Sequence, residues 1–309
     1  MIKIKRKSPC NNFTEKWTQI AKRLLSISIP ITLSASIMSI TNIIDLGLIM
    51  RSLGKIGYSE GSASALYGNY TTLAVPMLNL AISLITPISV AFLPIFTDCL
   101  VKNEYGRFLE TQRASLDLTA FVCAPITMGL MLFPKEILGL IFANSDIKIG
   151  AVLLFALAPS ILLASLLINV NTILEASGRV RAPLISMIIG SLAKIAVSNY
   201  LIVETDLQIL GAPIGTVISY GTALMVSLII YAREFKTGIP LFKSNIFPFA
   251  FAFVSVKFAR TLFDKSPQGP VFLILSILLS ALIYFSLSAF FVYLKGTKNR
   301  KVAKSTNFI

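Results

Sequence analysis

Long apolar segments separated by short polar connections make up most of the chain. A helix that crosses a lipid bilayer needs about 20 predominantly apolar residues, and by this measure the pattern predicts eight transmembrane helices. Their expected ranges are 24–50, 68–96, 114–134, 149–173, 183–203, 212–232, 246–264 and 270–294. We therefore predict an all-α, polytopic membrane protein.

The first apolar segment, residues 24–51, contains a carboxylate. On a helical wheel, a line of small and polar side chains forms one stripe, consisting of Pro30, Ser34, Met38, Thr41 and Asp45. An ionised acid costs about 2.5–3.5 kcal/mol at the centre of a membrane helix, and less when it lies off centre, as Asp45 does. We therefore expect this stripe to face water or protein and to form half of a cavity wall.

The second apolar segment repeats this pattern. Thr72, Pro76, Asn79, Ser83 and Thr86 follow one another at spacings that place them on one helical face. Proline removes a backbone hydrogen bond, and such breaks are tolerated in membranes where neighbouring groups or water satisfy the freed carbonyl. The polar side chains either line a cavity or join neighbouring helices. Their presence on two adjacent spans favours the cavity.

Three basic side chains lie inside the predicted spans. Lys194 falls near the middle of the fifth span, from which a lysine cannot readily reach water. We expect it in a polar interior, where it either pairs with an acid or a carbonyl or contacts substrate. Lys257 and Arg260 lie one turn apart near the outer end of the seventh span. They either extend to lipid headgroups or form a phosphate-binding patch, since arginine suits bidentate contact with phosphate.

Basic residues are distributed unevenly over the tails and connections. The two tails and the loops 97–113, 174–182 and 233–245 contain 20 Lys and Arg, whereas the alternate loops contain five. Because cytoplasmic loops are enriched in Lys and Arg, both termini are predicted to be cytoplasmic in a cell membrane. The formal net charge of +14 then reflects topology and contact with anionic lipid. The tails lack the interleaved aromatic residues that single-stranded nucleic acid requires, so we expect no nucleic-acid partner.

Other features of the sequence argue against an enzyme. The chain has no histidine, and its three cysteines are widely spaced, which excludes a disulfide framework and offers no metal-binding pattern. No phosphate-binding loop, dinucleotide glycine pattern or nucleophile elbow is present. The outer connections are too short to hold a folded catalytic loop. We therefore expect no catalytic residue, cofactor or metal, and any transport must draw energy from an ion gradient, the membrane potential or a partner.

Two further patterns concern helix packing. The segment 134–146 is short and amphipathic, which is typical of a helix that lies in the membrane interface. Gly211, Gly215 and Gly221 fall near the start of the sixth span and predict a close approach of two helices.

Six motifs follow one another over about residues 24–231. They are IPITLSASIMSITNIIDLGLIMRSL, GYSEGSASALYGNYTTLAVPMLNL, FANSD, TILEASGRVRAPL, GSLAKIAVSNYLIV and GAPIGTVISYG. In this order they resemble the polysaccharide-type flippases akin to stage V sporulation protein B, within the multidrug, oligosaccharidyl-lipid and polysaccharide exporter superfamily. The last two spans fit less well. Members typically have two six-helix lobes plus two extra helices, and move undecaprenyl-pyrophosphate-linked sugars outward by alternating access.

The resemblance implies a domain organisation for the chain. Residues 24–235 correspond to the second six-helix lobe and 246–294 to the two additional helices, between basic cytoplasmic tails at 1–23 and 295–309. The first lobe is absent from the chain, and the family residues proposed to bind pyrophosphate lie mainly there. Asp45 and Lys194 match polar positions of the subfamily, but no defined role is carried over to them.

We therefore expect a flippase module for lipid-linked oligosaccharide or cell-wall precursor, in contact with membrane lipid. It is expected to act with a separately encoded first lobe or a second copy, because a single lobe would open to lipid and leave Asp45 without a partner. Two alternatives remain: an inactive, truncated remnant, and a lobe of a cation-coupled multidrug exporter. The expected substrate path consists of Ser34, Thr41, Asp45, Thr72, Asn79, Ser83, Thr86, Lys194, Lys257 and Arg260.

Overall fold

The computed structural model describes residues 17–142, 147–235, 241–265 and 269–306, which are almost entirely helical and contain no strand. For some residues, Ser34 and 241–246 among them, only the backbone is described. The elements, in chain order, are α1 (Trp17–Lys55), α2 (Glu60–Asn69), the π-helix η1 (Tyr70–Ala74), α3 (Val75–Lys102), α4 (Tyr105–Leu132), α5 (Pro134–Ile141), α6 (Ile147–Leu157), α7 (Pro159–Ala176), α8 (Ala182–Glu204), the 3₁₀-helix η2 (Gln208–Leu210), α9 (Gly211–Phe235), α10 (Leu241–Lys265) and α11 (Pro270–Thr306).

The predicted all-α fold class is confirmed. Among the described residues, six helical segments are long and apolar enough to cross a membrane, namely Glu60–Lys102, Tyr105–Leu132, Pro159–Ala176, Ala182–Glu204, Gln208–Phe235 and Pro270–Phe290. The other two predicted spans, the first and the seventh, coincide with α1 and α10. The fourth predicted span is divided into α6 and α7 because Pro159 cannot donate the backbone hydrogen bond that a continuous helix requires.

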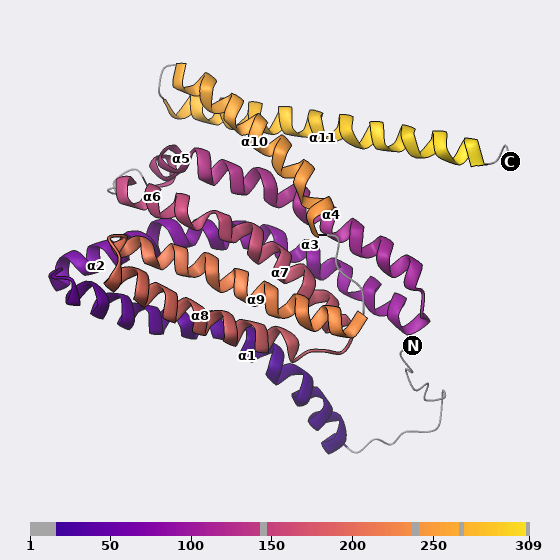
Figure 1. The fold of residues 1–309 in the computed structure, drawn as a ribbon, viewed down its shortest axis with the longest axis horizontal. Coiled ribbons are helices and arrows are strands. Elements are labelled where there is room, and N and C mark those ends of the chain that lie inside the picture. Colours follow the sequence, from indigo (N-terminus) through magenta and orange to yellow (C-terminus); the bar gives the residue numbers. More distant parts are fainter. Residues whose placement is uncertain (1–16, 143–146, 236–240, 266–268, 307–309) are drawn as a thin grey trace.

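Consecutive long helices run in opposite directions, as Figure 1 shows. The α1–α2 and α8–α9 connections gather at the left end of the view, together with α5, the start of α6, the end of α10 and the start of α11. The α3–α4 and α7–α8 connections lie at the right. This alternation is what the distribution of basic residues predicts, and which end faces the cytoplasm stays a prediction.

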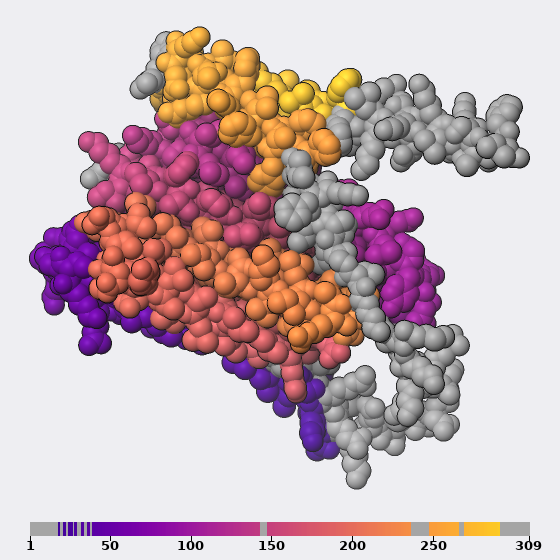
Figure 2. All heavy atoms as spheres, in the orientation of Figure 1, coloured from indigo at the N-terminus to yellow at the C-terminus, as the bar shows by residue number. Residues whose placement is uncertain are grey.

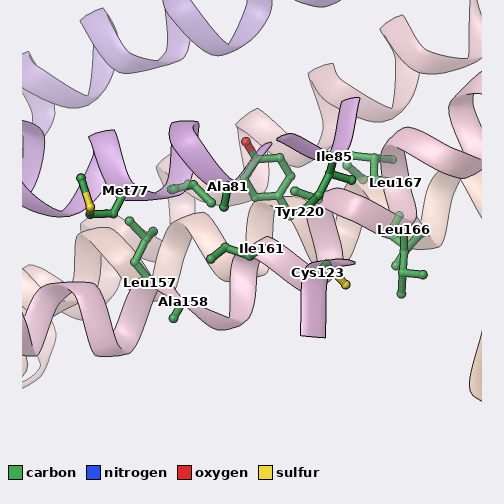
Figure 3. Packing of buried hydrophobic residues seen from close by; sticks show 14 of the residues in the cluster. Met77, Ala81, Ile85, Cys123, Leu157, Ala158, Ile161, Leu166, Leu167 and Tyr220 are labelled. Atoms are coloured by element: carbon green, nitrogen blue, oxygen red, sulfur yellow. The ribbon is translucent and has the colours of Figure 1, made fainter. Parts of the chain in front are cut away.

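The helices α1 to α9 share one large apolar core, which runs through the lobe. Figure 3 shows part of it, where Met77 and Ile85 of α3 meet Leu157 and Ile161 of the α6–α7 segment and the ring of Tyr220 from α9. The helices α10 and α11 pack outside this lobe, with α10 lying across α4 (Figure 1). Two smaller apolar clusters join α10 and α11 to α4.

The most extensive interface between two helices is that of α8 and α9, which cover the front of the lobe in Figure 2. Glycine makes this interface close. A Cβ at Gly190 would lie 2.7 Å from the backbone oxygen of Ser219, and a Cβ at Gly215 would collide with Ser198. A Cβ at Gly211 would lie 2.8 Å from Ile202. The close approach predicted from Gly211 and Gly215 is confirmed.

Gly221 differs from the other glycines of α9. A Cβ there would meet only Leu163, at an ordinary 3.7 Å. The expectation that Gly221 also serves a close approach is therefore wrong, because it lies on the side of α9 that faces a flexible leucine rather than the backbone of α8.

Candidate functional site

A buried ion pair joins the first and fifth predicted spans. The carboxylate of Asp45 on α1 pairs with the ammonium group of Lys194 on α8, and the two side chains are 3% and 2% exposed. Each charge alone would be costly so far from water, whereas the pair compensates both. The polar stripe of α1 therefore faces α8.

Two hydrogen bonds flank this pair along the same helix interface. Thr41 Oγ1 lies 2.8 Å from Ser191 Oγ, and Ser52 Oγ donates to Asn199 Oδ1 at 2.9 Å. Both helices run in the same direction (Figure 1), so the contacts follow one another in register. We call these three polar contacts, Thr41–Ser191, Asp45–Lys194 and Ser52–Asn199, the α1–α8 seam.

The seam contradicts two expectations from the sequence. The stripe of α1 was expected to form a cavity wall, but Thr41 and Asp45 are each 2% exposed and contact α8. A single lobe was expected to leave Asp45 without a partner, but Lys194 of the same chain provides one. A helical wheel identifies the polar face of a helix, and it does not identify the helix that covers this face. Ser34 belongs to the same stripe, but its side chain lies outside the described residues.

The polar stripe of the second span behaves differently. Thr72 of η1 and Asn79 and Ser83 of α3 are exposed on the outside of the lobe, and Thr86 is half-buried. The hydroxyls of Thr72, Ser83 and Thr86 donate to backbone carbonyls one turn earlier, at 2.6, 2.8 and 2.9 Å. In the part of the chain that the structure describes, the Asn79 amide has no hydrogen-bond partner and none of the four joins another helix. This α3 stripe therefore faces outward.

Lys257 and Arg260 have separate surroundings. Arg260 Nη1 lies 2.6 Å from Glu136 Oε1 on α5, and Nε lies 3.2 Å from Asp264 Oδ1. Its guanidinium also lies over the ring of Phe133. Lys257 is exposed, with its ammonium 5.5 Å from the centre of the Phe253 ring. Arg260 is thus compensated within the chain, which neither of the two sequence interpretations anticipated.

Comparison with known proteins identifies the family of this fold. Residues 5–285 match the family described as lipid II flippase MurJ. The chain belongs to this family. Stage V sporulation protein B of Bacillus subtilis (strain 168) is 23% identical over 223 residues, which are 72% of this chain and 42% of that protein. The predicted resemblance is confirmed.

A solved structure shows that the fold is shared as well. The structure titled "Lipid II flippase MurJ, inward closed conformation" superposes with a TM-score of 0.64 at 16% sequence identity, over 88% of this chain and 55% of that one. The chain spans about half the length of the relatives it matches. It is a multi-pass membrane protein of a flippase family.

This MurJ-family chain also contains polar contacts that the sequence analysis missed. Asn169 Nδ2 on α7 donates to Ser115 Oγ and Thr119 Oγ1 on α4, at 2.7 and 3.1 Å, with all three residues fully buried. Tyr231 on α9 donates to Gln112 Oε1 at 3.2 Å. Gln112, Ser115 and Thr119 lie at i, i+3 and i+7 on one face of α4, and this spacing was the signal that would have revealed them. These contacts hold α4 against α7 and α9 inside the lobe.

Glu136 was missed as well. The sequence predicts an amphipathic interfacial helix over 134–146; α5 forms at its start, and residues 143–146 lie outside the described residues. The carboxylate of Glu136 then lies beside Arg260 of α10. The signal available in the sequence was charge. Glu136 is an acid on a helix predicted near the outer membrane surface, at the same depth as Lys257 and Arg260.

Proposed function

We propose that this chain is one lobe of a flippase for undecaprenyl-pyrophosphate-linked oligosaccharide or another cell-wall precursor. It acts by alternating access with a second lobe, which is either encoded separately or supplied by another copy of the chain. Both termini lie in the cytoplasm. Family membership and the shared fold support a lipid-linked cargo, and the outward α3 stripe supports a second lobe.

The α3 stripe is the observation that carries this proposal. A surface that faces only hydrocarbon has no reason to expose an asparagine amide, because an unsatisfied amide in a membrane costs several kcal/mol. Asn79, Ser83 and Thr72 are exposed on one side of the second span. A second lobe packed opposite this side encloses a polar path, in which sugar hydroxyls bind the amide and the hydroxyl oxygens.

The remaining predicted path residues take different parts in this proposal. Thr41, Asp45 and Lys194 hold α1 and α8 together, so that the lobe moves as one body during alternating access. Lys257 is exposed and provides positive charge for an anionic headgroup, whereas Arg260 fixes α10 to α5 through Glu136. Ser34 stays a predicted path residue.

Replacing the polar groups of the α3 stripe is expected to slow transport without unfolding the lobe. In an Asn79→Leu and Ser83→Ala double variant, we expect the flipping rate to fall by at least about tenfold, because each lost hydrogen bond to substrate is worth about 0.5–1.5 kcal/mol. The measurement uses proteoliposomes that contain the chain, its second lobe and a fluorescent undecaprenyl-pyrophosphate disaccharide.

The matched control for this experiment is Val90→Leu, at an exposed apolar position of the same helix. It is expected to flip the lipid at the wild-type rate. Wild-type flipping in the double variant would remove the α3 stripe from the path. No flipping by the wild-type chain, tested both as a homodimer and with its separately encoded partner, would overturn the proposed function.

The predicted orientation can be tested by labelling. In a Cys10→Ser background, Ala65→Cys on α2 is expected to react in intact cells with a membrane-impermeant maleimide. Glu110→Cys on α4 is expected to react only after the cells are permeabilised. Both positions are exposed, whereas Cys99 and Cys123 are buried, so they are expected not to react. The opposite labelling pattern would place both termini outside the cell.

A further inference from the structure

A cavity of about 540 Å³ lies where α1 meets α2, at the end of the lobe that is predicted to face outward. It is formed by the last turns of α1, the connection that follows and the first turns of α2. The lining residues are Met50, Arg51, Gly54, Tyr58, Glu60, Ala63 and Ser64. This volume falls within the range of about 300–1,000 Å³ that is usual for small-molecule sites.

Two residues of opposite charge, Arg51 and Glu60, line this cavity and form no ion pair with each other. Arg51 and Glu60 are both exposed, and in the described part of the chain neither forms an ion pair or a hydrogen bond with another residue. The hydroxyl of Ser64 also has no partner there. The cavity therefore presents free donors, free acceptors and a hydroxyl to whatever enters it.

An aromatic wall completes the cavity. The phenol of Tyr58 donates to Gln208 Oε1 of η2 at 2.5 Å. Gln208 has a positive φ of 49°, a backbone conformation that non-glycine residues rarely adopt. This hydrogen bond links the Tyr58 side chain to the α8–α9 connection, and the Tyr58 ring forms one wall of the site.

The chemistry of these groups selects among ligand classes. A phosphate would be repelled by Glu60, and a cation would be repelled by Arg51. An acyl or isoprenyl chain would leave both charges without partners. A neutral polyhydroxylated ring can contact Arg51, Glu60 and Tyr58 together. Its hydroxyls accept from the guanidinium and donate to the carboxylate, and its C–H face packs on the aromatic ring.

We propose that this cavity is a carbohydrate-binding site that engages a neutral sugar at the outer end of the lobe. The assignment of this sugar to the glycan part of the transported lipid rests on the proposed function. Arg51 and Glu60 hold ring hydroxyls from two sides, Ser64 adds a third contact and Tyr58 stacks against the ring. The site then binds the headgroup as it leaves the polar path beside α3.

The test is direct binding to the full chain in lipid nanodiscs. N,N′-diacetylchitobiose is the probe, and saturation-transfer difference NMR measures its Kd. The disaccharide is expected to bind the wild-type chain, and Arg51→Gln and Glu60→Gln are each expected to raise the Kd by about tenfold or more, because each removes a charge-assisted hydrogen bond. Lys55→Gln, one turn beyond Arg51 and outside the cavity, is the matched control and is expected to leave the Kd unchanged.

The unfolding temperature of each variant is measured alongside, so that a loss of binding is distinguished from a loss of folded protein. Arg51 and Glu60 have no intrachain partner in the described chain, and both variants are expected to unfold at the wild-type temperature. Absence of binding to the wild-type chain, or an unchanged Kd in both variants, would overturn the proposal. Competition by inorganic phosphate at equal strength would also overturn it.

The two proposals fail in distinguishable ways. If the chain and its second lobe flip the lipid while the disaccharide does not bind, only the carbohydrate site is wrong. If the disaccharide binds and the Arg51→Gln and Glu60→Gln variants weaken it, but no lipid is flipped, the carbohydrate site stands and the flippase proposal is wrong.

Discussion

Replacing Lys194 alone by methionine is expected to destabilise the lobe by about 3–5 kcal/mol, because it leaves the buried Asp45 carboxylate without a compensating charge. Asp45 is 2% exposed and lies on the seam between α1 and α8, where water does not replace the missing ammonium group. The measurement is the free energy of unfolding of the purified chain in detergent, followed by circular dichroism.

Removing both charges together is expected to restore most of this stability. Buried ion pairs are often replaced by apolar residues without loss, so an Asp45→Leu and Lys194→Met double variant should come close to the wild type. Lys257→Met is the control: this exposed lysine pairs with no carboxylate in the described chain, and its replacement is expected to change stability by less than about 0.5 kcal/mol. A double variant as unstable as Lys194→Met would show that the pair is not what stabilises the seam.

The contrast between the two polar stripes shows how far the sequence could predict the site. Both stripes were visible as helical periodicity, and both helices form where they were expected. Asp45 nevertheless faces α8, while Asn79 faces outward. Periodicity specifies a face within one helix, whereas the partner of this face depends on how distant helices pack. Only the structure supplies that arrangement.

The sequence also did not predict which charged residues on distant helices form ion pairs. Lys194 was expected to find either an acid, a carbonyl or a substrate, and the acid was Asp45 itself. Arg260 of α10 pairs with Glu136 of the short helix α5. In both cases the sequence contained both charges at compatible depths in the membrane. Matching opposite charges by predicted depth would have found both pairs.

The α8–α9 interface, by contrast, followed from local sequence. Small residues let two helix backbones approach closely in a membrane, and Gly211 and Gly215 predicted such an approach. Gly190 completes it from α8, one turn before Lys194. Gly215 also lies against the backbone of α8 at Lys194, since a Cβ there would lie 3.3 Å from the Lys194 backbone oxygen.

Adding one methyl group at this interface is expected to separate the helices. In Gly190→Ala, the new Cβ would lie 2.7 Å from the backbone oxygen of Ser219 and 3.0 Å from the Cβ of Ala223, and the backbone cannot rotate away. Overpacking of this kind costs about 1–3 kcal/mol, which exceeds the gain of about 0.5–1 kcal/mol from replacing a helical glycine. The free energy of unfolding in detergent is expected to fall accordingly.

Gly221→Ala is the matched control, since its Cβ would meet only Leu163 at 3.7 Å. The same gain in helix propensity then acts without a clash, and this variant is expected to be as stable as the wild type or slightly more stable. Equal stability of the two variants would show that α8 moves freely against α9. A lower stability of Gly190→Ala alone would show that the backbone contact between Gly190 and Ser219 holds α8 and α9 together.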